Sequence, residues 1–193
     1  MRHPLTGGVS EPEPRTVVSL EEVYDRHADY VYQSLRRLGV PPAGLSDAFQ
    51  DVFVVVHRRL AELDGSGSVK SWLFVVALGV ARNHRRSLRR KGPERGESPR
   101  VDPDHLGGRS EEPLERAAHA ERVELFYKLL ETLDEDKRAV FVLAELEELS
   151  VPEIAETLSI NLNTAYARLR AARQKFELAL ARFRAREQGV VRR

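Results

Sequence analysis

The sequence predicts an all-α protein of two small helical domains joined by a flexible linker, the second domain containing a helix-turn-helix. Apolar residues recur at helical spacing on both sides of residues 92–113. Helix-capping patterns precede most of these stretches, and the segment between them is rich in Gly and Pro. The 193 residues leave room for one domain or two small ones, and no stretch reads convincingly as a strand.

The first domain is predicted to span residues 18–91, after a disordered tail at residues 1–17. Its first helix begins at a capping box formed by Ser19 and Glu22. The same helix is expected to end at Gly39, because glycine readily adopts the left-handed conformation that follows a helix.

Two more helices are expected in this domain. Ser46 is predicted to cap the second, which carries the apolar run 52–56. This run alone is compatible with a buried strand, but the polar helix formers around it favour a helix. Ser68 is predicted to cap the third helix. Gly79 lies within that helix and indicates close packing there, because glycine costs up to about 1 kcal/mol relative to alanine.

Residues 92–113 are predicted to form the linker. They contain four Gly and four Pro in 22 residues and almost no apolar side chain, so they cannot build a core. Fully extended at about 3.3 Å per residue, such a segment reaches roughly 70 Å. The two domains can therefore lie far apart when they bind something large.

The second domain is predicted at residues 114–186, followed by a C-terminal tail at 187–193. Asp134 is expected to cap one of its helices, and Ser150 with Glu153 forms another capping box. A tight turn then leads to Asn161, which is expected to cap a long last helix. A short helix, a tight turn and a second helix with an apolar inner stripe form the helix-turn-helix pattern.

Composition excludes several classes of protein. The longest apolar run is far shorter than the roughly 20 residues that span a bilayer, so no membrane insertion is expected. The chain has no cysteine, which excludes disulfides and thiolate metal sites and fits a reducing cytoplasm. Its six His residues lack metal-ligand spacing, and no phosphate-binding loop or nucleophile elbow is present. We therefore expect neither an enzyme nor a cofactor.

The net charge of +1 conceals a marked segregation of charge. Residues 18–91 carry 12 basic and 8 acidic side chains, and residues 150–193 carry 9 basic and 4 acidic ones. Residues 114–149 between them carry 5 basic and 10 acidic side chains. Two basic regions thus flank an acidic middle, which can shield them from nucleic acid.

The last helix offers small polar groups and Arg on its outer face, a combination that suits base edges and phosphates. An ordinary helical hairpin with a solvated basic face remains possible, although the local positive charge favours DNA. The basic tract at residues 82–91 has six basic residues in ten and no acidic one. With Trp72 upstream it suits single-stranded bases, but a solvated helix end and a core tryptophan would look the same.

These motifs resemble the extracytoplasmic-function sigma factors of bacterial RNA polymerase. The first domain contributes DAFQDVF at residues 47–53 and SWLFVVA at residues 71–77, followed by the basic tract. The second contributes LDEDKRAVF at 133–141, LSVPEIAE at 149–156 and NTAYARL at 163–169. The resemblance covers about residues 19–182 in the order found in the family.

The resemblance implies a dissociable specificity subunit that binds core RNA polymerase, reads and melts the −10 promoter element with its first domain, and reads the −35 element with its second. It also implies an anti-sigma factor and a cytoplasmic location, with the protein on the nucleoid when bound to polymerase. The polymerase-binding residues would be Gln50, Asp51, Phe53, Val54 and His57. Those at the −10 element would be Asp64, Ser66, Lys70, Trp72, Arg82, Asn83, Arg85, Arg86 and Arg89. Those at the −35 element would be Asn161, Asn163, Thr164, Tyr166, Ala167, Arg168, Arg170 and Arg173.

Some residues depart from the family pattern. Gly79 stands where the family commonly has a polar residue, Tyr166 replaces a frequent Lys, and Ser159 replaces a usual Gly in the turn. Independently of the family, Val54 and Val55 lie off the inward stripe of their helix, which indicates a partner surface or a fully buried helix. A stand-alone helix-turn-helix repressor or activator is the alternative function, and it would require a dimer on two half-sites.

Overall fold

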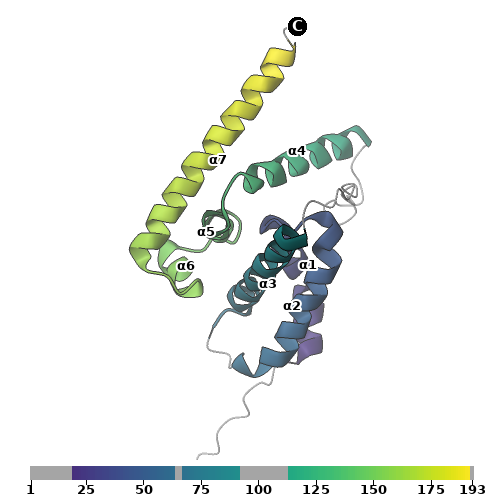
Figure 1. Cartoon of the computed structure of the whole chain (residues 1–193), viewed down its shortest axis with the longest axis vertical. Helices are drawn as coiled ribbons and strands as arrows, with labels where there is room; N and C mark the ends of the chain where they lie inside the picture. Colours follow the sequence, from purple (N-terminus) through teal and green to yellow (C-terminus); the bar gives the residue numbers. More distant parts are fainter. Residues whose placement is uncertain (1–18, 64–66, 92–112, 192–193) are drawn as a thin grey trace, which may run out of the picture.

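The computed structural model describes residues 19–63, 67–91 and 113–191 and contains no strand within them, which confirms the all-α prediction (Figure 1). Two short 3-10 turns, η1 (Pro42–Gly44) and η2 (Leu60–Glu62), flank the second helix. The seven helices of the described residues are α1 (Leu20–Arg37), α2 (Leu45–Arg59), α3 (Val69–Lys91), α4 (Pro113–Glu131), α5 (Glu135–Glu145), α6 (Val151–Thr157) and α7 (Leu162–Val191).

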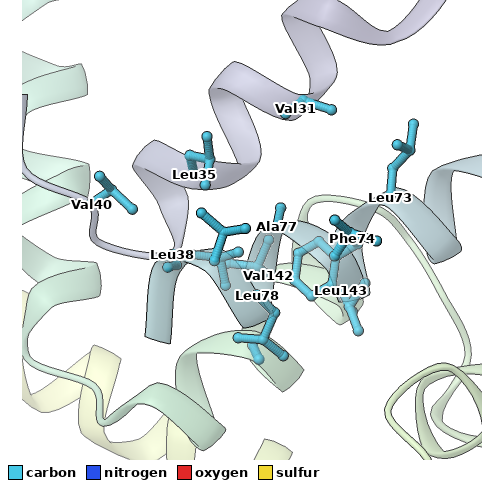
Figure 2. Packing of buried hydrophobic residues seen from close by; sticks show 14 of the residues in the cluster. Val31, Leu35, Leu38, Val40, Leu73, Phe74, Ala77, Leu78, Val142 and Leu143 are labelled. Carbon is cyan, nitrogen blue, oxygen red and sulfur yellow. The ribbon is translucent and has the colours of Figure 1, made fainter. Parts of the chain in front are cut away.

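Helices α1, α2 and α3 pack against one another around an apolar core. Val31, Leu35, Val52 and Phe74 are completely buried in it, and Figure 2 shows three of these side chains from α1 and α3. Residues at helical spacing thus turn one face of each helix inward. The run 52–56 is helical as predicted. Its two fully buried residues, Val52 and Val56, are four positions apart, which is the spacing of one inward-facing side of a helix.

The start and end of α1 follow the sequence signals. The Ser19 hydroxyl accepts a hydrogen bond from the Glu22 amide at 3.1 Å, and the Glu22 carboxylate accepts one from the Ser19 amide at 3.1 Å. Gly39 follows the helix with a φ of +85°, a conformation that is strained for other residues. Both predictions are confirmed.

Two expectations for the first half are wrong. Ser46 does not cap α2, because the 3-10 turn at Pro42–Gly44 already sets the chain direction and the helix begins at Leu45. Gly79 is not closely packed, because a Cβ atom added there would meet no heavy atom within 4 Å. Gly79 therefore lies on the exposed side of α3, between buried Leu78 and Val80, and its helix cost is not offset by packing.

The second half contains the predicted caps. Asp134 accepts a hydrogen bond from the Lys137 amide at 3.0 Å, and Ser150 and Glu153 form their capping box. The Asn161 side chain accepts one from the Asn163 amide at 2.8 Å at the start of α7. In the turn between α6 and α7, Ser159 has a φ of +51°, which explains why glycine suits this position.

The two halves share a single buried cluster. Val142 and Leu143 of α5 belong to the same cluster as Phe74 and Leu78 of α3, as Figure 2 shows. The proposed linker lies outside the described residues except for Pro113. Helix α7 continues to Val191, beyond the predicted end of the second domain, and projects past the rest of the chain (Figure 1).

Candidate partner and nucleic-acid interfaces

A groove of about 620 Å³ runs between α1 and α2 on the outside of the first half. Its floor is aromatic: the ring of Tyr24 lies 4.9 Å from that of Phe53, and the rings of Phe49 and Phe53 are 5.0 Å apart. Val54 at its edge is 47% exposed, which is high for an aliphatic side chain in a folded helix. We call this feature the aromatic groove, and its lining residues are Leu20, Tyr24, Ser46, Phe49, Gln50, Phe53, Val54, His57 and Arg58.

The aromatic groove brings together four of the five residues predicted to bind polymerase. Gln50, Phe53, Val54 and His57 line it, while Asp51 is exposed on the same helix but does not line the groove. Sequence reasoning missed Leu20, Tyr24 and Phe49. All three are apolar or aromatic residues of predicted helices, which is the signal that could have pointed to them. The sequence does not show that α1 packs against α2, and this packing brings them into one groove.

The predicted −10 residues are spread along α3. Lys70 is exposed near its start, with its ammonium 5.5 Å from the ring centre of Tyr30. Trp72 is half-buried, and the guanidinium of Arg59 lies 6.0 Å from its ring. Further along the helix, Arg82, Asn83 and Arg86 are exposed and Arg85 is half-buried. Asp64, Ser66 and the side chain of Arg89 lie outside the described residues.

One face of the last helix is buried and the opposite face is exposed. Ala165, Leu169 and Ala172 are buried against the rest of the second half, whereas the outward residues are exposed. Tyr166 on this outward face is 53% exposed. We define the polar face of α7 as five of its exposed residues, Asn163, Thr164, Tyr166, Ala167 and Arg170. The predicted Arg173 is exposed further along the helix. A helix that follows a short helix and a tight turn and presents such a face has the geometry that enters the DNA major groove.

Four of the predicted DNA-binding arginines form ion pairs in this structure. Arg85 of α3 binds Glu135 at 3.1 Å. Arg82 of α3 and Arg168 of α7 bind the two oxygens of one carboxylate, Asp136, at 2.7 and 2.5 Å. Arg173 binds Glu145 at 2.7 Å. Asn161 caps α7, so its Oδ1 accepts a hydrogen bond from the backbone amide of Asn163.

The described residues bring together no group of three or more His, Asp or Glu side chains that could hold a metal ion. None of the helices in the described ranges is long and apolar enough to cross a membrane. The candidate surfaces among the described residues are the aromatic groove, the cationic stretch of α3 and the polar face of α7.

An apolar groove, a basic helix and a helix-turn-helix on one helical chain are a combination typical of DNA-binding proteins. Two family models match the chain: the model described as Sigma-70 region 2 matches residues 23–91, and that described as Sigma-70, region 4 matches residues 124–176. The RNA polymerase sigma factor CnrH of Cupriavidus metallidurans is 30% identical over 158 residues, which cover 80% of this chain and 83% of CnrH.

Other relatives agree. The ECF RNA polymerase sigma-E factor of Escherichia coli is 26% identical over 143 residues, 72% of this chain and 74% of that protein. The structure of CnrH with the cytosolic domain of CnrY superposes with a TM-score of 0.57 at 25% identity, covering 84% of this chain and 87% of CnrH. The structure of the sigma factor RpoE of Bartonella quintana in complex with the anti-sigma factor NepR has the same fold. It matches with a TM-score of 0.64 at 16% identity, covering 83% of this chain and 96% of RpoE.

The chain belongs to the extracytoplasmic-function sigma factors of bacterial RNA polymerase. Its function is to direct RNA polymerase to promoters.

Proposed function

We propose that the two halves have separate roles in promoter recognition, in which residues 18–91 bind core polymerase and open the −10 element, and residues 114–186 read the −35 element. The observation that carries the proposal is the sharp separation of the two faces of α7, with Ala165, Leu169 and Ala172 buried and the polar face exposed. The buried stripe fixes the orientation of the helix on α5 and α6. The polar face is then free to contact base edges.

The aromatic groove is the proposed polymerase-binding surface. Exposed Val54 and the aromatic rings of Phe49 and Phe53 place apolar atoms together at the surface of α2. Aromatic side chains in a groove typically anchor a partner, because they bury large area with little loss of conformational freedom. Polar Gln50 and His57 at its rim supply hydrogen-bonding groups around that apolar centre.

The strand-opening surface is proposed along α3. Lys70 at its start and Arg82, Arg85 and Arg86 further on place cations along one helix, while Trp72 offers part of an aromatic ring. Cations that follow a backbone and aromatic rings that stack on bases are the components of single-strand binding. Extruding a base costs a few kcal/mol, which stacking and hydrogen bonds in a pocket recover. Asp64, Ser66 and Arg89 are proposed to complete this surface.

We also propose an anti-sigma factor as a protein partner. The solved structures of CnrH and RpoE are complexes, one with the cytosolic domain of CnrY and the other with the anti-sigma factor NepR. The similarity of the fold supports a comparable interaction here. We further propose that the chain acts in the cytoplasm, on the nucleoid when polymerase is bound, and that it carries no catalytic site, cofactor or metal of its own.

Tyr166→Ala tests the assignment of the −35 module. Because this side chain is 53% exposed on the polar face, its loss should spare folding and remove a contact to DNA. A base contact contributes about 1–3 kcal/mol, so we expect at least a fivefold loss of affinity for −35 duplex DNA, or an altered preferred sequence. Selection of −35 sequences from a randomised promoter library with the reconstituted holoenzyme measures both.

Leu178→Ala is the matched control, because Leu178 is also 53% exposed on α7 but lies outside the polar face. It should leave the selected sequences unchanged. If Tyr166→Ala and Leu178→Ala both select the wild-type −35 sequence with wild-type affinity, the polar face does not read this element. A palindromic footprint of the chain alone would instead support the repressor or activator.

A further inference from the structure

Two large apolar side chains are exposed together at the start of the last helix. Leu162 is the first residue of α7 and is 42% exposed, and Tyr166, one turn further on, is 53% exposed. Residues four positions apart lie on the same face of a helix, with Cβ atoms about 5–6 Å apart. Ala165 and Leu169 are buried on the opposite side, so the exposed face of this turn points away from the core. We call Leu162 and Tyr166 the apolar pair.

The apolar pair lies where a helix-turn-helix meets the bases. In this motif the N-terminal residues of the second helix contact base edges in the major groove. Helix α7 begins at Leu162, directly after the turn that follows α6, so both members of the pair belong to its first two turns. If residues 114–186 read the −35 element as proposed, the apolar pair faces the floor of the groove. Leu162 was not among the residues predicted to contact this element.

The same two turns lack the side chains that read guanine. Guanine is most often recognised by Arg or Lys, and residues 161–167 contain neither. Of the arginines that follow, Arg168 binds Asp136 and Arg173 binds Glu145. Arg170 is exposed but lies two turns beyond Leu162. The start of α7 therefore offers apolar surface to the bases instead of cations.

Thymine is the base that suits such a surface. In the major groove each base pair presents hydrogen-bond donors and acceptors, and thymine adds a 5-methyl group. Apolar side chains that cover the donors and acceptors of other bases leave them unpaired, which costs binding free energy. Contact with a methyl group instead removes apolar surface of both partners from water. One buried methyl group corresponds to about a fourfold gain in affinity.

We propose that the apolar pair recognises the 5-methyl groups of thymines in the −35 duplex, so that the element carries A·T pairs opposite the start of α7. This inference rests on the proposed function of the second half and names the bases that it recognises. The 5–6 Å between the two Cβ atoms corresponds to about two steps of 3.4 Å in duplex DNA. The contacted thymines should therefore fall within three consecutive base pairs, on either strand.

Replacement of thymine by uracil tests the proposal, because uracil pairs with adenine in the same way and lacks only the methyl group. The preferred −35 sequence is first selected from a randomised library with holoenzyme reconstituted from the full-length chain and core polymerase. Each thymine in that duplex is then replaced singly by uracil, and affinity is measured by competition. We expect about a fourfold loss for each contacted methyl group and no loss for uracil in the spacer.

Variants of the apolar pair show whether its side chains cause the uracil effect. In Leu162→Ala and Tyr166→Ala, thymine and uracil promoters should bind equally at the position that the lost side chain contacts. Leu178→Ala is the matched control and should keep the full uracil effect, because Leu178 is equally exposed on α7 but away from its start. All three variants should keep the wild-type Tm, since the altered side chains are exposed.

Tyr166→Lys gives a change in the opposite direction. A lysine ammonium donates to O6 and N7 of guanine, so this variant should select a G·C pair at a position where the wild-type chain selects A·T. Selection from the same randomised library measures the change. Retention of the wild-type A·T pair by Tyr166→Lys would contradict the role of Tyr166.

Two results would overturn the proposal. One is a selected −35 element without thymine in the three base pairs that α7 contacts first. The other is a uracil effect that is absent in the wild type or unchanged in Leu162→Ala and Tyr166→Ala, which would assign it to the DNA alone. Failure of the proposed function looks different, because the wild-type holoenzyme would then select no −35 element at all.

Discussion

Gly39→Ala is expected to lower the free energy of unfolding by about 2–4 kcal/mol. The backbone at Gly39 has a φ of +85°, which an alanine adopts only with strain. A Cβ atom there would also lie 1.7 Å from Nη1 of Arg138 and 2.7 Å from Nη2 of Arg85. These two guanidinium groups would have to move.

Arg138 cannot move without losing buried hydrogen bonds. Its Nη2 donates to the carbonyl of Leu133 at 2.9 Å and its Nη1 to that of Leu38. Displacing the guanidinium leaves a charged, desolvated group without these acceptors, which is among the more costly changes in a protein interior. The contact between the two halves is lost at the same time.

Thermal unfolding followed by circular dichroism measures the effect of Gly39→Ala. For a chain of this size 1 kcal/mol corresponds to about 2–4 °C, so we expect the Tm to fall by roughly 5–15 °C. Gly79→Ala is the matched control, because a Cβ atom at that exposed helix position meets nothing within 4 Å, and it should raise stability by up to about 1 kcal/mol. A Tm of Gly39→Ala within about 1 °C of wild type would contradict the packing of Arg138 against Gly39.

Val54→Glu is expected to weaken binding to core polymerase by more than tenfold. The side chain is 47% exposed at the edge of the aromatic groove, so the helix accepts glutamate without loss of core packing. In the complex, however, a carboxylate would be buried in an apolar contact, and an i,i+4 pair with Arg58 would offset only about 0.2–0.5 kcal/mol of its desolvation. The resulting desolvation cost exceeds the roughly 1.4 kcal/mol that corresponds to a tenfold change in affinity.

Leu178→Glu controls for the added charge, because Leu178 is similarly exposed on α7, away from the aromatic groove. Both variants should keep the wild-type Tm, and only Val54→Glu should lose affinity in a titration of labelled chain with core polymerase. Equal affinities of the two variants for polymerase would show that the aromatic groove is not the polymerase-binding surface.

Local sequence signals predicted the helices well. The capping boxes at Ser19 and Ser150 and the caps at Asp134 and Asn161 depend on residues two or three positions apart, so their patterns are legible without any tertiary information. The prediction that Ser46 caps α2 was wrong for a related reason. The turn before α2 competes with a side-chain cap, and a serine near the start of a helix does not reveal which of the two is used.

Contacts between distant segments were not predictable. The hydrogen bond from Arg138 to Leu38 joins residues 100 positions apart, and that from Arg82 to Asp136 joins residues 54 positions apart. The segregation of charge along the chain indicated that an acidic middle can shield basic ends, but it did not identify Glu135 and Asp136. The environment of Gly79 was not predictable either, because a glycine in a helical sequence does not reveal whether packed side chains or solvent surround it.

The candidate surfaces were predicted in part. The outward residues of α7 follow from helical periodicity once the buried stripe is recognised. The aromatic groove was predicted in part. Helical periodicity predicts that Val54 faces away from the core, but it does not show that Tyr24 of α1 packs against Phe53 of α2.

Reconstituted transcription tests the central claim most directly. Purified full-length chain is mixed with bacterial core RNA polymerase and a library of templates randomised at both promoter elements, and transcript starts are sequenced. We predict that starts at fixed positions appear only when the chain is present, and that the templates used share two unlike sequence elements. Absence of chain-dependent starts, together with no binding of the chain to core polymerase, would contradict the account.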